Sequence, residues 1–198
     1  MIIKSKTHRS RGAYHAVLGY IFREEARYRD SEGRELFVRH NVMGRPEQID
    51  FMVKQFRDNL DLRSRSRSDN IQIVHEILSF HPEDSHEISS ADLKTMTRAW
   101  IEKRGPQGMY VAVAHGDKEH VHVHVVSSPL EFGTGKSMRL SRAQFSTLQQ
   151  SMQELQQERF PHLSRSVVEY GSKKKPDSDR PIGRSSFRRG VCARTKRS

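Results

Sequence analysis

The stretch Val111-Ala-Val-Ala-His115-Gly-Asp-Lys-Glu-His120-Val-His122-Val-His124-Val-Val126 decides how this chain of 198 residues folds. Apolar residues recur on both sides of the turn-forming segment 116–119, which predicts two strands joined as a hairpin, at residues 109–114 and 120–126. Alternate side chains of a strand point to the same face of a sheet. One face of the second strand therefore carries valines, and the other carries three histidines: His120, His122 and His124.

The same hairpin adds a fourth histidine to this face. If residues 116–119 form a four-residue loop, His115 lies opposite His120 and faces the same way. Several imidazoles converging from rigid strands suit a divalent metal ion. Asp117 is placed to accept the second ring N–H of a ligand histidine. An exposed polar strand face is the plain alternative, but four histidines within ten residues, with an acidic residue between them, favour a metal or catalytic site.

The rest of the chain predicts a mixed α/β fold. Apolar residues at helical spacing, with capping and stop signals, predict helices over residues 14–29, 46–60, 89–105 and 141–160. A β-branched run over residues 71–80 predicts another strand. Helices interspersed with hairpin-connected strands indicate an α/β (α+β) sandwich built on an antiparallel sheet.

The charge of the chain indicates a polyanionic partner. Lys and Arg number 35 against 24 acidic residues, a formal charge of +11, which favours binding to nucleic acid. Ten Lys and Arg residues and two Asp residues lie between Lys173 and Ser198, so eight of the eleven net charges fall there. We therefore expect one folded domain over residues 1–170 and a basic, unpacked tail or linker over residues 171–198.

Several other classes of protein are excluded by composition. Cys192 is the single cysteine, so no disulfide forms within one chain, as is typical of a reducing compartment. No apolar run approaches the roughly 20 residues that a membrane span needs, and the first residues lack the apolar core of a signal peptide. We expect a soluble, intracellular protein with no membrane span.

The longer histidine pattern resembles a known family. His115-x-Asp117-x-x-His120-x-His122-x-His124 is similar to the third motif of the relaxase/mobilization nucleases, which belong to the HUH (His-hydrophobic-His) endonucleases. The nearest class is MOBP, the plasmid-mobilization and T-DNA border nickases. The resemblance implies that His122 and His124 form the HUH pair, that His115 is the third metal ligand and that His120 is a further participant. It also implies Mg or Mn as the working ion, although other transition metals can substitute.

A second resemblance points to the nucleophile. The segment Ala13-Tyr-His-Ala-Val-Leu-Gly-Tyr20-Ile-Phe-Arg-Glu is similar to the family's first motif, which implies that Tyr20 attacks the DNA. A phosphotyrosyl ester keeps the energy of the phosphodiester, so the strand can be rejoined. Tyr28 is the reserve candidate and Tyr14 the third. Asp117 is expected to assist removal of the Tyr20 proton as well as to orient a ligand histidine. The plain alternative is that Tyr20 is a core aromatic residue of an amphipathic helix.

Two further segments supply candidates for contacts with DNA or metal. Ile73-Val-His-Glu-Ile-Leu-Ser79-Phe-His-Pro resembles the family's second motif, which implies that Ser79 contacts DNA near the scissile phosphate. Glu76 in the same strand is a secondary candidate for the metal. Gly133-Thr-Gly135-Lys136-Ser137 looks like the end of a phosphate-binding P-loop, but Leu130 stands where the first glycine is required. We therefore interpret it as a turn with a DNA-facing lysine, Lys136.

Together these features predict a relaxase that nicks one DNA strand at an origin of transfer, forms a 5′-phosphotyrosyl intermediate and can religate it. The expected partner is single-stranded DNA, with the enzyme a monomer on DNA. The resemblance to the family also implies relaxosome accessory proteins, a secretion coupling protein and a place in the bacterial cytoplasm. Because the ligand histidines must be neutral, activity should fall below about pH 6.

Three alternatives remain at this point. A histidine-triad nucleotide hydrolase would need neither metal nor Tyr20. A DNA-binding accessory module would bind without cutting. Another HUH enzyme, a replication initiator or transposase, would place its nucleophile after the histidines, where Tyr170 is available.

Overall fold

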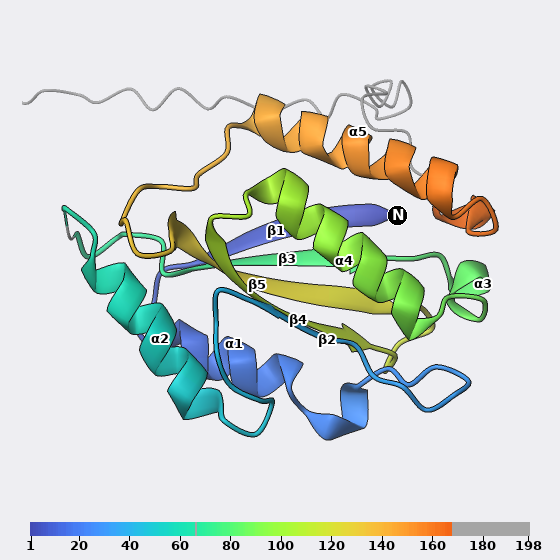
Figure 1. The fold of residues 1–198 in the computed structure, drawn as a ribbon, viewed down its shortest axis with the longest axis horizontal. Helices are drawn as coiled ribbons and strands as arrows, with labels where there is room; N and C mark the ends of the chain where they lie inside the picture. The colour runs from blue at the N-terminus through green and yellow to red at the C-terminus, as the bar shows by residue number, and fades with distance from the viewer. Residues whose placement is uncertain (66, 168–198) are drawn as a thin grey trace, which may run out of the picture.

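The computed structural model describes residues 1–65 and 67–167, and a single antiparallel sheet forms their centre (Figure 1). Its strands lie in the order β1-β3-β5-β4-β2. Their bounds are Ile2–His8 (β1), Phe37–His40 (β2), Ile73–Ser79 (β3), Gly108–His115 (β4) and His122–Glu131 (β5). The predicted fold class is confirmed by this arrangement, and the tail at residues 171–198 lies outside the described residues.

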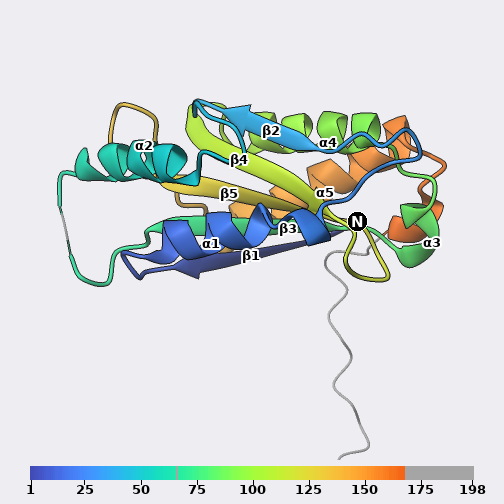
Figure 2. The same ribbon diagram turned by 90° about the horizontal axis from the view of Figure 1, so that it is seen from below.

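Helices cover the two faces of the sheet. The helices α1 (Ala13–Ile21) and α2 (Ile49–Asp61) contact each other and share a core with one face. The helices α4 (Ser90–Arg104) and α5 (Arg142–Arg159) pack on the other face. Figures 1 and 2 show α1 beside α2, and α4 passing across the strands. Short helical segments complete the chain at Glu24–Ala26 (η1), Pro82–Ser85 (α3) and Ser164–Ser166 (η2).

Alternation along the strands explains why two separate cores form. In β4, Val111 and Val113 belong to the core under α1 and α2, whereas Tyr110, Ala112 and Ala114 belong to the core under α4 and α5. Both β4 and β5 are buried on both faces: β4 is apolar almost throughout, whereas β5 also buries His122, His124 and two serines. The histidines of the hairpin take positions on the α1 side that apolar residues would otherwise fill.

The hairpin between β4 and β5 differs from the prediction in its register. His115 pairs with His122, and Val113 pairs with His124, so the connection comprises residues 116–121 rather than 116–119. The shift is two residues. Because side chains alternate with a period of two, this shift leaves every side chain on its predicted face, and the histidines still converge.

Helix and strand ends show where local patterns were insufficient. Ser89 and Ser141 begin α4 and α5 with capping boxes, as their sequences predicted. The predicted helix at residues 14–29 ends at Ile21, and Arg23 is extended, because residues 23–29 leave the helix to approach β4. β1 and β2 were missed because both are edge strands with exposed side chains. No helix within the described ranges is long and apolar enough to cross a membrane.

Candidate metal centre and nucleophile

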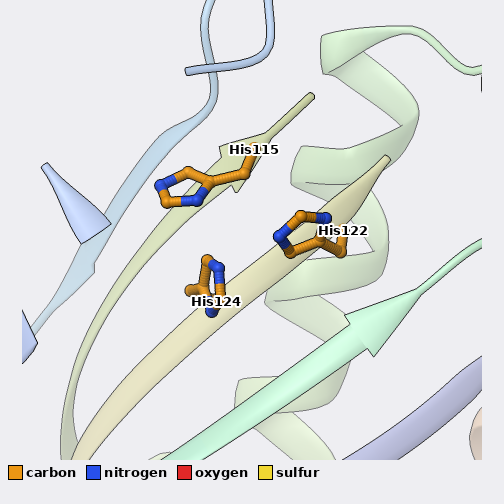
Figure 3. Close-up of side chains that lie close together, drawn as sticks. All are labelled: His115, His122 and His124. Carbon is orange, nitrogen blue, oxygen red and sulfur yellow. The ribbon is translucent and has the colours of Figure 1, made fainter. Parts of the chain in front are cut away.

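Three buried histidines meet where β4 ends and β5 begins. His115 comes from β4, and His122 and His124 come from β5, and Figure 3 shows their rings close together. One ring nitrogen of each lies within 4.8 Å of the others, a separation that small side-chain rotations close around one ion. The ring centroids of His115 and His124 are 4.4 Å apart, and those of His122 and His124 are 4.8 Å apart. The predicted histidine set is therefore brought together.

The hydrogen bonds of these rings leave one nitrogen of each for a metal. His115 donates from Nε2 to the carbonyl of Ile21 at 2.8 Å, and His122 donates from Nδ1 to the carbonyl of His120 at 3.3 Å. The Nδ1 of His124 lies 2.9 Å from Nε2 of His75. Each ligand ring is thus oriented through its second nitrogen, as in known metal sites.

Two of the remaining nitrogens are buried without a partner. Nδ1 of His115 and Nε2 of His124 make no hydrogen bond to any described residue. Buried polar atoms almost always have a partner, so orphaned atoms at one point indicate a missing ligand. Imidazole lone pairs that converge in this way are the donor set of a divalent metal ion, and the residues present fit such a group.

Burial also sets the protonation of the three rings. Desolvation lowers the pKa of His115, His122 and His124 below the ordinary histidine value of 6.5. Repulsion from neighbouring histidines adds to the lowering of the pKa of His122 and His124, and Arg23 and Arg27 add to that of His115. Neutral rings are the metal-binding form, so the site stays competent at lower pH than free histidines would.

Tyr20 lies directly over this centre. Its ring, 40 % exposed, has its centroid 5.4 Å from that of His124 and 5.7 Å from that of His115. The guanidinium carbon of Arg23 lies 4.3 Å from the Tyr20 ring centroid, a cation–π contact. Tyr20 also lines a pocket of about 620 Å³. An accessible tyrosine beside converging histidines is the arrangement that a metal-assisted attack on a phosphate requires.

Asp117 occupies a different position from the one expected. It was expected to accept the second N–H of a ligand ring, but that acceptor for His122 is the carbonyl of His120. Oδ2 of Asp117 instead accepts from Arg23 at 2.8 Å, and Oδ1 lies 3.8 Å from Nε2 of His122. Asp117 therefore connects the Arg23 side chain to the histidine centre.

Two other predicted residues flank the centre. Ser79, half-buried at the end of β3, pairs with His122 across the strands. His120 lies in the connection before β5, and its ring centroid is 5.5 Å from that of His122. His120 is outside the group of three converging nitrogens, and it contributes its carbonyl to the orientation of His122.

Four other predicted residues lie away from the histidines. Glu76 faces the α4 side of the sheet, so the expectation that it could reach the metal was wrong. The hydroxyl of Tyr28 donates to the carbonyl of Ile88 at 2.7 Å, and Tyr14 is buried and stacked on Phe56. Lys136 lies in the turn after β5, at the opposite end of that strand from the histidines.

Sequence analysis missed two residues of the centre. Strand alternation places His75 on the same face of β3 as Ser79, as the structure shows. The sequence did not reveal that β3 pairs with β5, so the contact between His75 and His124 could not be predicted. Arg23 was inside the predicted helix, where it would have pointed to solvent. Its position depends on the chain leaving the helix at Ile21, which no local signal marks.

Comparisons with known proteins identify the family and the fold of this chain. The sequence matches the family model for the MobA/VirD2-like relaxase nuclease domain over residues 20–159. The comparison with curated proteins finds no match.

Solved structures share the fold at low sequence identity. One is the MobM relaxase domain (MOBV; Mob_Pre) bound to Mn and to 22 nucleotides of oriT DNA from plasmid pMV158. It is 12 % identical to this chain, with a TM-score of 0.62, and the match covers 88 % of this chain and 94 % of that chain. A structure described as the molecular basis of vancomycin resistance transfer in Staphylococcus aureus is 12 % identical, with a TM-score of 0.55 over 87 % and 98 %.

The family match covers well over half of the chain and begins at Tyr20, and the fold agrees with solved relaxase domains. The expected family is therefore confirmed, and the histidine-triad hydrolase alternative is set aside: this chain belongs to the relaxases, with a nuclease domain of the MobA/VirD2-like type.

Proposed function

We propose that this chain nicks one strand of DNA at an origin of transfer and joins the cut strand to its own tyrosine. The observation that carries the proposal is the accessible ring of Tyr20 beside His115 and His124, each of which has a buried ring nitrogen without a described partner. A relative with the same fold, the MobM relaxase domain, is bound to oriT DNA and Mn.

In this proposal, Oη of Tyr20 attacks the scissile phosphorus in line with the bond to the 3′ oxygen. The Oη–P bond forms and the P–O3′ bond breaks, giving a 5′-phosphotyrosyl enzyme and a free 3′-hydroxyl. The phenol loses a proton and the leaving oxygen gains one, so the exchange conserves both atoms and charge. The reverse of this reaction, carried out by the same residues, rejoins the strand.

The histidines would hold the metal ion of the reaction. His115, His122 and His124 are the proposed ligands, because their free nitrogens converge. A divalent ion such as Mg or Mn supplies, when bound, Lewis-acid charge to the non-bridging oxygens of the phosphate. The acceptors on the second ring nitrogens fix how each ligand is turned, so the chain's contribution is a preformed cradle.

Arg23 and Asp117 would position the nucleophile. The Arg23 guanidinium lies on the Tyr20 ring and is held there by Asp117. We propose that this pair keeps the ring over the histidines. The expected role of Asp117 in removing the Tyr20 proton is not supported by a hydrogen bond, because its partners among the described residues are Arg23 and His122. Ser79, beside His122 at the strand end, is proposed to contact DNA next to the scissile phosphate.

The test is covalent adduct formation on a labelled single-stranded oligonucleotide that carries the nick region of the element encoding this chain. Wild type with Mn²⁺ should give a protein–DNA band, and mass spectrometry should locate the nucleotide on Tyr20. EDTA should abolish the band.

Two variants give the decisive lanes. Tyr20→Phe keeps the ring and its stacking on Arg23 but removes the attacking oxygen, so it should bind DNA and form no adduct. Tyr28→Phe is the matched control and should react like wild type. An adduct that persists in Tyr20→Phe would reassign the nucleophile, and binding without any adduct in wild type would favour the DNA-binding module.

A further inference from the structure

A cluster of positively charged side chains lies far from the histidines. A cleft of about 630 Å³ is lined by six cationic side chains from three separate segments and by one acidic residue, Asp69. Asp69 is paired with Arg9. The cationic residues are Arg9, Arg63, Arg65, Arg67, Lys136 and Arg139.

Most of this charge has no ion-pair partner in residues 1–65 and 67–167. Among the residues that the structure describes, Arg65, Arg67, Lys136 and Arg139 form no ion pair, and all four are exposed. Holding like charges together around one hollow is unfavourable unless an anion is bound there. The cleft is therefore suited to a polyanion.

The glycine-rich turn that resembled a P-loop builds one wall of this cleft. Gly135 has φ of +72°, and a Cβ there would collide with the backbone of Leu62 at the end of α2. The backbone N–H of Gly133 donates to Oδ1 of buried Asn59 at 2.9 Å. These contacts hold Lys136 against the arginine-rich segment that follows α2, although the two are distant in sequence.

Further basic residues lie between the cleft and the nucleophile. Ser10 and Gly12 line the pocket beside Tyr20, and Arg11 between them lines a neighbouring hollow with Arg57 and Arg63. Arg63 also lines the cleft. A strand of DNA leaving the histidines can thus follow cationic side chains along the surface between α1 and α2.

We propose that this cleft binds the phosphate backbone of DNA on one side of the nick, as an anchoring site separate from the chemistry. The inference rests on the proposed nicking function and extends it. Leu130 at the cleft follows His124 by six positions along β5, which is roughly 20 Å at a strand rise of ~3.3 Å. DNA at ~3.4 Å per nucleotide covers that distance in about six nucleotides.

The experiment compares two variants that lose the same charge. One replaces Arg65, Lys136 and Arg139 in the cleft by alanine, and the control replaces exposed Lys94, Arg98 and Lys103 on α4. The DNA affinity of each variant is measured as a function of salt on a short oligonucleotide spanning the nick. It is measured again on oligonucleotides extended to either side by about ten nucleotides, beyond the roughly six that reach the cleft.

We expect one extension to tighten binding by wild type and by the control, and the cleft variant to lose that gain. Three lost phosphate contacts on a single strand lower the slope of log K against log salt by about 2, a loss of roughly tenfold to a hundredfold near 0.1 M salt. Adduct formation at saturating short DNA should stay at the wild-type rate. A charge-preserving variant, Arg65→Lys with Lys136→Arg and Arg139→Lys, should retain the gain.

Each contrary result is distinct from a failure of nicking. If the cleft variant and the α4 control have equal affinities and salt slopes, the anchoring site is wrong although adducts still form. A loss of adduct on saturating short DNA, or an equal loss in the charge-preserving variant, would also overturn it. If wild type forms no adduct on any oligonucleotide, the nicking function itself fails.

Discussion

Two neighbouring residues of β3, His75 and Glu76, point to opposite faces of the sheet, and both are buried polar groups. Glu76 accepts from Trp100 at 3.0 Å and from Nε of Arg104 at 3.1 Å, and Arg104 in turn donates to the carbonyl of Met138 at 2.9 Å. His75 contacts His124, which retains a buried nitrogen without a described partner.

The difference separates a structural polar cluster from a reactive one. On the α4 side the charges of Glu76 and Arg104 neutralise each other and their hydrogen bonds are made within the protein, so this pair does not call for a ligand. On the α1 side the buried ring nitrogens of His115 and His124 have no described hydrogen-bond partner, and a bound ligand would supply one. Variants on the two faces should therefore affect different measurements.

The largest effect is expected from the histidine face. His122→Ala should reduce adduct formation by at least about a thousandfold, corresponding to ~4 kcal/mol of lost transition-state stabilisation. It should also remove high-affinity Mn²⁺ binding measured by titration calorimetry. His162→Ala, which changes a histidine outside the site, is the control. Wild-type Mn²⁺ affinity in His122→Ala would contradict the proposed ligand set.

The opposite face should control stability and leave metal affinity alone. Arg104→Ala leaves the Glu76 carboxylate buried without its cation, which should lower the free energy of unfolding by about 3–5 kcal/mol. Denaturant unfolding measures this change. The double variant Glu76→Gln with Arg104→Met should recover much of the loss. A weakened Mn²⁺ affinity in the folded fraction of Arg104→Ala would show that the two faces are not independent.

His75 is expected to act on the metal through His124. His75→Ala removes the partner of Nδ1 of His124, which should weaken Mn²⁺ binding by roughly tenfold to a hundredfold. His75→Gln keeps an acceptor oxygen and should restore part of the affinity. Calorimetry distinguishes this positioning role from a packing role, because packing alone would make the two variants equivalent.

The same contrast explains how much could be predicted from sequence. Alternation along residues 120–126 identified the face of His122 and His124, and the two-residue register shift left it unchanged. For Glu76 the alternation was correct too, but which face the metal occupied depended on β3 pairing with β5. Local patterns cannot give that non-local pairing.

Contacts made across the chain were the other part that sequence could not give. Arg23 reaches Tyr20 and Asp117 only because the chain leaves α1 at Ile21, and the bonds that hold it there join residues 94 positions apart. The cleft at Lys136 likewise depends on Gly135 packing against Leu62. In both cases the contact joins segments that are far apart in the sequence, which no local pattern predicts.

The smallest predicted effect is a dependence of stability on pH that comes from the histidine face. Burial lowers the pKa of His75 to about 4, and it also lowers the pKa of His115, His122 and His124 from the ordinary value of 6.5. Between pH 6.5 and about 4 the unfolded chain therefore binds protons that the metal-free folded chain does not. Stability should fall as the pH falls through this window.

Each buried histidine contributes up to ~1.4 kcal/mol per pH unit to that slope. His75→Gln should therefore flatten the pH dependence of metal-free unfolding by about one such increment, whereas Arg104→Ala should displace the whole curve without removing this histidine contribution. Urea unfolding in EDTA at closely spaced pH values measures both. An unchanged slope in His75→Gln would mean that His75 is protonated in the folded protein. In that case Nε2 of His75 would donate the hydrogen bond to Nδ1 of His124, rather than accept it.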